Sequence, residues 1–210
     1  MSLDLSDWTR PDRGALFVVT GASGTGKTTL VREALTRVPE LGWSVSMTTR
    51  APRTGEVDGK DYHFVSQESF TEAVARGELL EWAQVYGNRY GTPRGPVEAA
   101  LSAGRSILLE IDAQGAAQVR AALPEAVLIF ILPPSVEALE ARLRGRSTDS
   151  EQVIQRRLAD ANAQLRAAGD FDYLVVNETL SSAHDQFQAV LVAELRRRSR
   201  NSSLVSRFAR

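Results

Sequence analysis

Residues 21–28, GASGTGKT, constrain the fold of this chain more than any other segment. They fit the spacing G-x-x-x-x-G-K-[ST], follow the apolar run at 15–20 and precede the amphipathic run VREALTRV at 31–38. Glycines permit a sharp turn in which backbone N–H groups surround phosphate oxygens, and the next helix points its positive end at them. We therefore predict a strand, a phosphate-binding loop and a helix. The alternative, a glycine-rich turn before a core helix, leaves Lys27 unexplained.

This loop predicts a nucleoside triphosphate with Mg²⁺ as its ligand. Lys27 would reach the β- and γ-phosphate oxygens, and the hydroxyl of Thr28 would be a ligand of the metal. The loop residues expected to bind ATP are Gly21, Ala22, Ser23, Gly24, Thr25, Gly26, Lys27, Thr28 and Thr29. The loop alone leaves water, a protein hydroxyl and a small molecule open as acceptors of the γ-phosphoryl group.

Apolar runs alternate with helical patterns along the rest of the chain. The strand candidates are 15–20, 43–48, 106–112, 127–132 and 172–177. The helix candidates are 26–37, 94–103, 114–122, 135–144, 150–168 and 182–198. Continuous Val, Ile and Leu runs are typical of strands that are covered on both faces. The order predicts an α/β protein, a P-loop NTPase fold with a central parallel sheet flanked by helices.

Two segments interrupt this alternation. Residues 50–91 are polar and alternating, with a short helix expected near 68–76, and they predict a small mixed β insertion. Residues 142–157 are dense in charge and predict a helical lid. Insertions at the nucleotide end of a parallel sheet are natural candidates for an acceptor-binding module and a lid.

Composition limits the classes of protein and site. The 210 residues fit one domain. They contain no cysteine, which excludes disulfides and Cys-ligated zinc. The chain has only two histidines, His63 and His184. The net charge of −1, the lack of a long apolar run and the lack of a signal sequence lead us to expect a cytoplasmic protein without membrane or nucleic-acid partners. For the basic end at 196–210, a solvated tail is the interpretation and RNA binding the alternative.

Five ordered motifs carry a family resemblance. They are SMTTRAPRTGEVDGKDYHFV (46–65), EWAQVYGNRYGT (81–92), LEIDAQGA (109–116), RLRGRSTDSE (142–151) and VVN (175–177). Together they resemble guanylate kinases, P-loop enzymes that phosphorylate GMP with ATP. The resemblance implies one domain at 14–195 between tails at 1–13 and 196–210. Within it, the core would be 14–48, 93–141 and 158–195, the GMP-binding insertion 49–92 and the lid 142–157.

The resemblance implies a clamp for the acceptor phosphate. Arg50 and Arg53 would contact it through guanidinium groups, while Tyr62 and Tyr90 would donate hydroxyl hydrogens. Two guanidinium forks suit a dianionic phosphate, and each charged contact is worth about 1.5–3 kcal/mol. Taken without the motif, these arginines would be interpreted as solvated loop charges.

It also implies a set of residues that read the guanine base. The Glu81 carboxylate would accept from N1–H and the exocyclic amine, the Ser46 hydroxyl would donate to O6, and Thr92 would lie near the base. Adenine places an acceptor where guanine has N1–H, so such a site would reject it by roughly 10⁴-fold. Glu81 taken alone would be interpreted as a solvent-facing strand residue.

Other motif positions concern the metal, the donor and catalysis. Glu110 and Asp112 would border the acceptor and the hydrated Mg²⁺, with Asp112 acting through water; relatives often have Asp at the first position, which leaves their separate roles open. Asn177 would lie near the adenine of ATP. The expected catalytic residues are Lys27, Arg50, Arg142, Arg146 and Arg157. For the last three, an ordinary charged helix face is the alternative.

The implied reaction is direct in-line transfer from MgATP to GMP or dGMP, with no protein base. A non-catalytic guanylate-kinase-like binding module is one alternative, but the intact loop at 21–28 argues against it. A related P-loop kinase with another acceptor is the second, and the Ser46–Glu81 pair favours guanine over it. The sequence leaves the choice between a monomer and a homo-oligomer open.

Overall fold

The computed structural model describes residues 9–85, 87–144 and 151–208 of the chain. Its centre is a five-stranded sheet in the order β2-β7-β1-β8-β9, in which every pairing is parallel. The strands are β1 (Leu16–Thr20), β2 (Leu41–Trp43), β7 (Ser106–Glu110), β8 (Val127–Leu132) and β9 (Tyr173–Val176). The α/β fold predicted from the sequence is confirmed.

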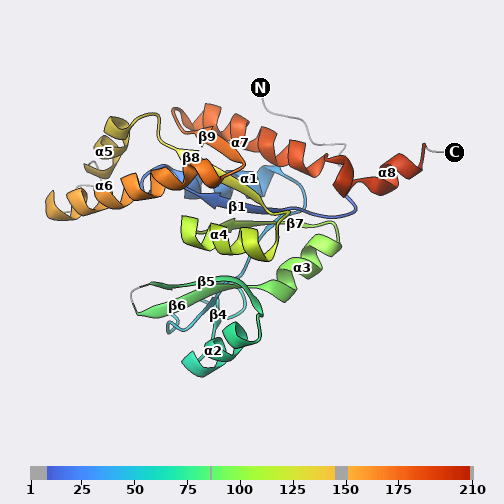
Figure 1. The fold of residues 1–210 in the computed structure, drawn as a ribbon, viewed down its shortest axis with the longest axis horizontal. Coiled ribbons are helices and arrows are strands. Elements are labelled where there is room, and N and C mark those ends of the chain that lie inside the picture. The colour runs from blue at the N-terminus through green and yellow to red at the C-terminus, as the bar shows by residue number, and fades with distance from the viewer. Residues whose placement is uncertain (1–8, 86, 145–150, 209–210) are drawn as a thin grey trace.

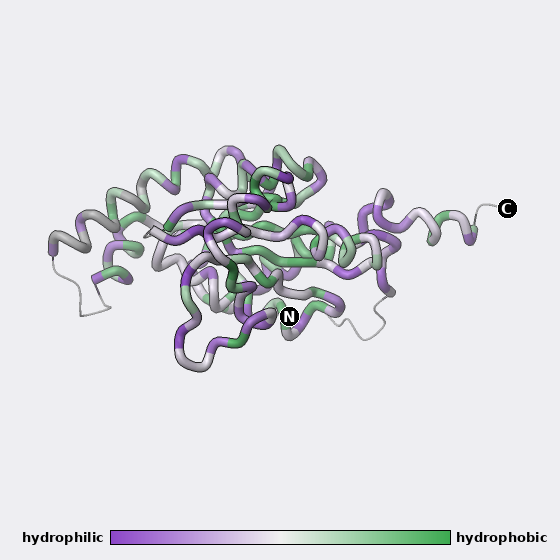
Figure 2. Tube along the Cα trace, turned by 90° about the horizontal axis from the view of Figure 1, so that it is seen from below, coloured by the Kyte–Doolittle hydropathy of each residue, from purple (hydrophilic) through white to green (hydrophobic). Residues whose placement is uncertain are grey.

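Helices cover both faces of this sheet, because side chains alternate along each strand. Phe17 and Val19 of β1 pack in a cluster with α1 (Lys27–Arg37) and α7 (Leu180–Leu195). Leu16 and Val18 pack in a second cluster with α3 (Arg94–Ser102) and α4 (Ala113–Ala122). Figure 1 shows these layers, and Figure 2 shows apolar segments gathered along the central strands.

A second sheet lies beyond α3 and α4 (Figure 1) and has the order β4-β3-β6-β5. Its strands are β3 (Met47–Thr48), β4 (His63–Phe64), β5 (Leu79–Val85) and β6 (Asn88–Pro93), and α2 (Gln67–Ala75) packs on one face through Phe70. The side chain of Gln118 in α4 bonds the backbone N–H and carbonyl of Trp82 in β5 at 3.1 and 3.0 Å. This contact ties the second sheet to the main body.

The predicted strand at 43–48 is wrong as a single element. Residue 43 ends β2 in the main sheet, whereas residues 47 and 48 form β3 in the second sheet, and residues 44–46 have no regular structure. A local apolar run predicts extended backbone but not the neighbour with which each residue pairs. The chain therefore crosses between the two sheets inside this run.

The helices α5 (Val136–Arg144) and α6 (Glu151–Arg166) pack against the glycine-rich loop. Leu139 and Leu143 of α5 and Ala161 of α6 form a buried cluster with Ala22 of that loop. A short 3-10 helix, η1 (Ala167–Asp170), then leads into β9. This cluster therefore packs α5 and α6 against the loop at Ala22.

The prediction of a solvated tail at 196–210 is wrong at Arg200 and Asn201, which are buried. Here η2 (Arg198–Arg200) and α8 (Ser202–Ser206) follow α7, and Arg200 is only 7% exposed. Arg200 donates to the carbonyl oxygens of Gly14 at 2.8 Å and Glu125 at 3.2 Å, which anchors this segment beside the start of β1. Within the described part of the chain, no helix is both long and apolar enough to cross a membrane.

Candidate active site

The loop 21–28 joins β1 to α1 at the carboxyl edge of the sheet, where ligands of parallel α/β proteins bind. Gly21, Gly24 and Gly26 have φ values of 152°, 89° and 87°, a range that side chains other than glycine rarely adopt. A Cβ at Gly21 would lie 2.4 Å from the carbonyl oxygen of Ile131 in β8. The glycines therefore permit both the turn and its close contact with the sheet.

Internal hydrogen bonds hold the loop in shape. The Lys27 ammonium donates to the carbonyl oxygens of Gly21 at 2.5 Å and Ala22 at 2.9 Å. The buried Thr25 hydroxyl also donates to the carbonyl of Ala22, at 2.9 Å. Lys27 thus lies across the mouth of the loop, where its charge faces the space that phosphates would enter.

Asn177 and Arg142 support the loop from outside. The Asn177 side-chain amide is buried and donates to the carbonyl of Thr25 at 2.7 Å. Arg142 of α5 donates to the backbone carbonyl of Asn177 at 2.9 Å. A Cβ at Gly26 would lie 2.4 Å from the Asn177 amide nitrogen, so this contact requires glycine. In this structure the Asn177 side chain binds the loop backbone.

The loop lines a cavity of about 460 Å³. On its other wall, the Thr28 hydroxyl lies 3.0 and 3.2 Å from the two carboxylate oxygens of Glu110. Asp112 also lines it and caps α4, accepting from the Gly115 N–H at 2.8 Å. Gln164 of α6 completes the lining. Thr28, Glu110 and Asp112 therefore surround one space with oxygen atoms.

Two of the three residues expected to read a base lie opposite each other in the second sheet. Thr92 in β6 pairs with Glu81 in β5, and its hydroxyl donates to the Glu81 carboxylate at 2.6 Å. On the other side of β6, Met47 pairs with Gly91, and extending this register by one residue sets Ser46 opposite Thr92. Residues at paired positions share a face, so Thr92 and Glu81 lie side by side, and Ser46, just before β3, would continue this row if the register of β3 extended to it.

A β-bulge turns Glu81 toward this face. The register of β5 shifts between Leu79 and Glu81. Leu79 packs against Phe70 of α2, and Trp82 also contacts that ring, with centroids 6.4 Å apart. Without the shift, the parity of the strand would place Glu81 on the side of Leu79. Because of the bulge, Leu79 and Trp82 both face α2, while Glu81 faces the other side of the sheet.

Glu81 is buried, and no ion pair joins it to a cationic side chain among the described residues. It is 6% exposed, and burial raises the pKa of its carboxyl group, while the Thr92 hydroxyl opposes that rise. A Cβ on Gly115 would lie 3.1 Å from the second carboxylate oxygen, so the backbone of α4 lies close to Glu81 at this glycine. A buried carboxylate of this kind requires hydrogen-bond donors to remain ionised.

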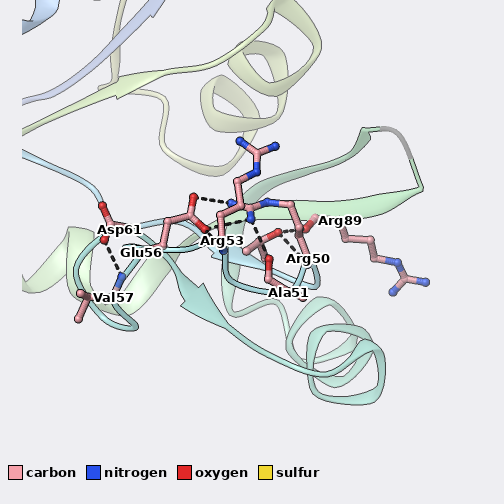
Figure 3. Close-up of polar contacts among 8 residues, drawn as sticks. Arg50, Ala51, Arg53, Glu56, Val57, Asp61 and Arg89 are labelled. Carbon is pink, nitrogen blue, oxygen red and sulfur yellow. Dashed lines mark hydrogen bonds and ion pairs between the residues drawn. The ribbon is translucent and has the colours of Figure 1, made fainter.

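Three of the four residues expected to hold the acceptor phosphate lie together beside this face of the second sheet. Tyr90 is two residues from Thr92 in β6, and its ring centroid lies 6.0 Å from that of Tyr62. The Arg50 guanidinium carbon is 5.4 Å from the Tyr62 ring centroid. Figure 3 shows Arg50 bound by Glu56. Arg50, Tyr62 and Tyr90 therefore converge, whereas Arg53 contributes its backbone N–H and has an exposed side chain.

The expected lid arginines are only partly described. Arg142 contacts Asn177 as above, Arg146 lies outside the described residues, and Arg157 lies in α6 with its side chain outside them as well. Arg144, which the sequence did not single out, binds the carboxylates of Glu140 and Glu151. The pattern of a charged helix face with its own counterions thus applies to Arg144.

A second cavity, of about 580 Å³, lies at the opposite edge of the sheet, by the first residues of β8 and β9. Its arginines are largely neutralised: Arg13 pairs with Glu125 and Arg120 with Asp172. Among the described residues, none of the glycine-rich loop lines this cavity. We therefore assign the nucleotide to the smaller cavity.

The fold agrees with comparisons to known proteins. A family model for guanylate kinase matches residues 13–194. The chain belongs to the guanylate kinase family. It is therefore an enzyme, a nucleotide-binding kinase. Among relatives, the guanylate kinase of Dechloromonas aromatica is 53% identical over 86% of this chain and 89% of its own length, and that of Thermus thermophilus is 54% identical over 90% and 85%. The crystal structure of guanylate kinase from Anaplasma phagocytophilum superposes with a TM-score of 0.69, at 35% identity over 90% of each chain.

Two residues of this guanylate kinase site were missed by the sequence analysis. Gln164 lines the nucleotide cavity from a long helix whose pattern contains no motif. Glu56 binds Arg50 from within the RTGE stretch, three residues after Arg53. An acid so close to two arginines was the available signal for Glu56, whereas for Gln164 the sequence offered none.

Proposed function

We propose that this enzyme transfers the γ-phosphoryl group of MgATP directly to the phosphate of GMP, giving ADP and GDP. The observation that carries the proposal is that Glu81 and Thr92 pair on the face of the second sheet that also carries Tyr90, whose ring lies beside Tyr62 and, through it, Arg50. One end of that face suits a purine with paired N–H donors, and the other suits a phosphate. The glycine-rich loop supplies the donor site.

On the donor side, the loop would hold the triphosphate through backbone N–H groups and the start of α1. The Lys27 ammonium would exchange its carbonyl partners for the β- and γ-phosphate oxygens. The GMP phosphate is already an anionic nucleophile, so no protein base is required. The residues serve to align two anions and to neutralise their charge.

The oxygen atoms beside the loop suit Mg²⁺. Thr28 would be a direct ligand, and Glu110 and Asp112 would hold waters of the metal, since Mg²⁺ prefers oxygen and keeps several waters. Among the described residues there is no group of three or more His, Asp or Glu side chains that could hold a metal alone. This agrees with a site shared with substrate phosphates. When bound, the ion would neutralise the charge on the transferred phosphoryl group.

On the acceptor side, the ionised Glu81 carboxylate would accept from guanine N1–H and N2–H. These donors would compensate for the burial that raises the pKa of Glu81. Ser46 would donate to O6 in the same row. Adenine would set a lone pair against the buried carboxylate, which accounts for selection of guanine.

Closure of the two predicted insertions, 49–92 and 142–157, would bring the sites together and exclude water. We assign Arg142, Arg146 and Arg157 to the donor phosphates in that closed state, Arg53 to the acceptor phosphate and Asn177 to the loop beside the adenine. The reaction would serve purine nucleotide metabolism and GMP recycling in the cytoplasm, with GMP or dGMP as acceptor.

The test is ADP release from MgATP with GMP, AMP, UMP and CMP as acceptors, coupled to NADH oxidation. We expect strong turnover with GMP alone among the four ribonucleotides, and loss of turnover on removal of Mg²⁺. Comparable rates with AMP or UMP would refute the assignment of Glu81 and Ser46. Absence of ADP release with every acceptor would refute catalysis and favour a binding module.

A further inference from the structure

Glu56 holds the Arg50 side chain in a two-point ion pair. The Nη1 and Nη2 atoms of Arg50 donate to the two oxygens of the Glu56 carboxylate at 3.0 and 2.8 Å (Figure 3). The side chains of Arg50 and Glu56 are only 13% and 20% exposed. The Arg50 guanidinium lowers the pKa of Glu56, so this carboxylate is ionised at neutral pH. The pair is therefore geometrically ideal and partly shielded from water.

This contact leaves one edge of the guanidinium for a ligand. A guanidinium has five N–H donors, and the pair with Glu56 uses the end formed by Nη1 and Nη2. Nη1 also donates to the Ala51 carbonyl at 2.8 Å, and the rings of Tyr62 and Phe64 lie 5.4 and 5.8 Å from the guanidinium carbon. The donors that this leaves, Nε–H and the second Nη2 hydrogen, can reach a phosphate together with the Tyr90 hydroxyl, which also hydrogen-bonds this guanidinium.

Glu56 also closes the loop that carries both arginines. One of its oxygens accepts from the Arg53 backbone N–H at 2.7 Å, and its own N–H donates to the Arg53 carbonyl at 3.1 Å. A phosphate that took the place of the carboxylate would break the Arg53 contact and leave Glu56 without its cation. The contacts therefore favour a carboxylate that stays in place when the acceptor binds.

We propose that Glu56 is a positioning residue for the acceptor phosphate: it fixes Arg50 by one edge so that the other edge faces the phosphate. This inference rests on the proposed function, since it takes a nucleoside monophosphate as the acceptor. Glu56 would act only through Arg50 and the loop at 50–56. Its contribution therefore belongs to the phosphate of GMP and not to the guanine base.

The test compares Glu56→Gln and Glu56→Ala with Asp61→Asn as the matched control. Asp61 follows the loop at 50–56 and accepts from the Val57 N–H at 2.7 Å, outside the contacts of Arg50 (Figure 3). Binding of GMP and of guanosine, which lacks the phosphate, is measured by calorimetry, and KM is measured for GMP and ATP. We expect Glu56→Gln to weaken GMP binding and raise its KM about tenfold or more, because a neutral amide holds a guanidinium less firmly. Guanosine affinity and the KM for ATP stay within about twofold, and Asp61→Asn resembles the wild type.

Three outcomes would overturn the inference. Unchanged GMP affinity in Glu56→Gln would show that Arg50 needs no support. Tighter GMP binding would show that the carboxylate competes with the phosphate. An equal loss for GMP and guanosine would indicate general damage to the second sheet, and Glu56→Ala would then show the same pattern. A wild-type protein that binds neither compound would refute the proposed function itself, and with it this role of Glu56.

Discussion

Replacing Glu81 with glutamine tests the recognition of guanine most directly. The Thr92 hydroxyl donates to one carboxylate oxygen at 2.6 Å, so it favours an amide whose oxygen takes that position. The amide NH₂ then occupies the position of the second oxygen, beside Gly115, where it faces a guanine N–H donor. Loss of one charge-assisted hydrogen bond and weakening of the other costs about 3 kcal/mol, which corresponds to roughly a 150-fold rise in KM for GMP.

The assay is steady-state ADP release at saturating MgATP with the GMP concentration varied. It is then repeated at saturating GMP with the MgATP concentration varied. Glu78→Gln is the matched control, because Glu78 lies just before β5 and its carboxylate forms an exposed pair with Arg76. We expect the control to resemble the wild type and the KM for ATP of Glu81→Gln to change less than twofold. A GMP effect below fivefold, or a parallel loss for ATP, would refute the assignment of Glu81 as the base reader.

The same substitution has a second consequence, for stability. Burial raises the pKa of Glu81 in the folded chain above its ordinary value of 4.5. The folded state then holds the proton more tightly than the unfolded state, so this stabilisation is complete below about pH 4.5 and is lost as the pH rises through the folded-state pKa. Without nucleotide, Glu81→Gln should therefore raise Tm at pH 7 and have a smaller effect at pH 4. An unchanged or lower Tm at pH 7 would show that the carboxylate is not destabilising in the folded chain.

Three further substitutions separate catalysis, donor binding and stability. Lys27→Ala should lower kcat by about 10²-fold or more with the KM for GMP nearly constant, because it removes the positive charge that would neutralise the transferred phosphoryl group. Unaltered turnover in the ADP-release assay would contradict that role. Gly26→Ala should weaken ATP binding in calorimetry while guanosine binding persists, because its Cβ would lie 2.4 Å from the Asn177 amide nitrogen; equal losses for both ligands would point to misfolding. Arg200→Met leaves the carbonyl oxygens of Gly14 and Glu125 without their donor, so the free energy of unfolding in urea should fall by about 2–3 kcal/mol with kcat unchanged. An unchanged urea midpoint would show that this anchor is dispensable.

Much of the main sheet was predictable because its signals are local. β1 is buried along its whole length. Its sequence is therefore a continuous apolar run, without the alternation of polar and apolar residues that is typical of a surface strand. Extended backbone was also correctly predicted near 47–48, but its sheet was not, since pairing depends on residues distant in sequence. The burial of Arg200 escaped prediction for a similar reason: its partners, Gly14 and Glu125, are far from it in the chain.

The sequence by itself determined the loop at 21–28, the parallel α/β order and the family, because glycine spacing, apolar periodicity and ordered motifs are properties of short segments. Only the tertiary structure decided which groups meet. It set Asn177 against Thr25 and Glu110 against Thr28, and it joined Glu56 to Arg50. Such pairings depend on how strands pair and helices pack, since a side chain's partners are fixed by distances in space.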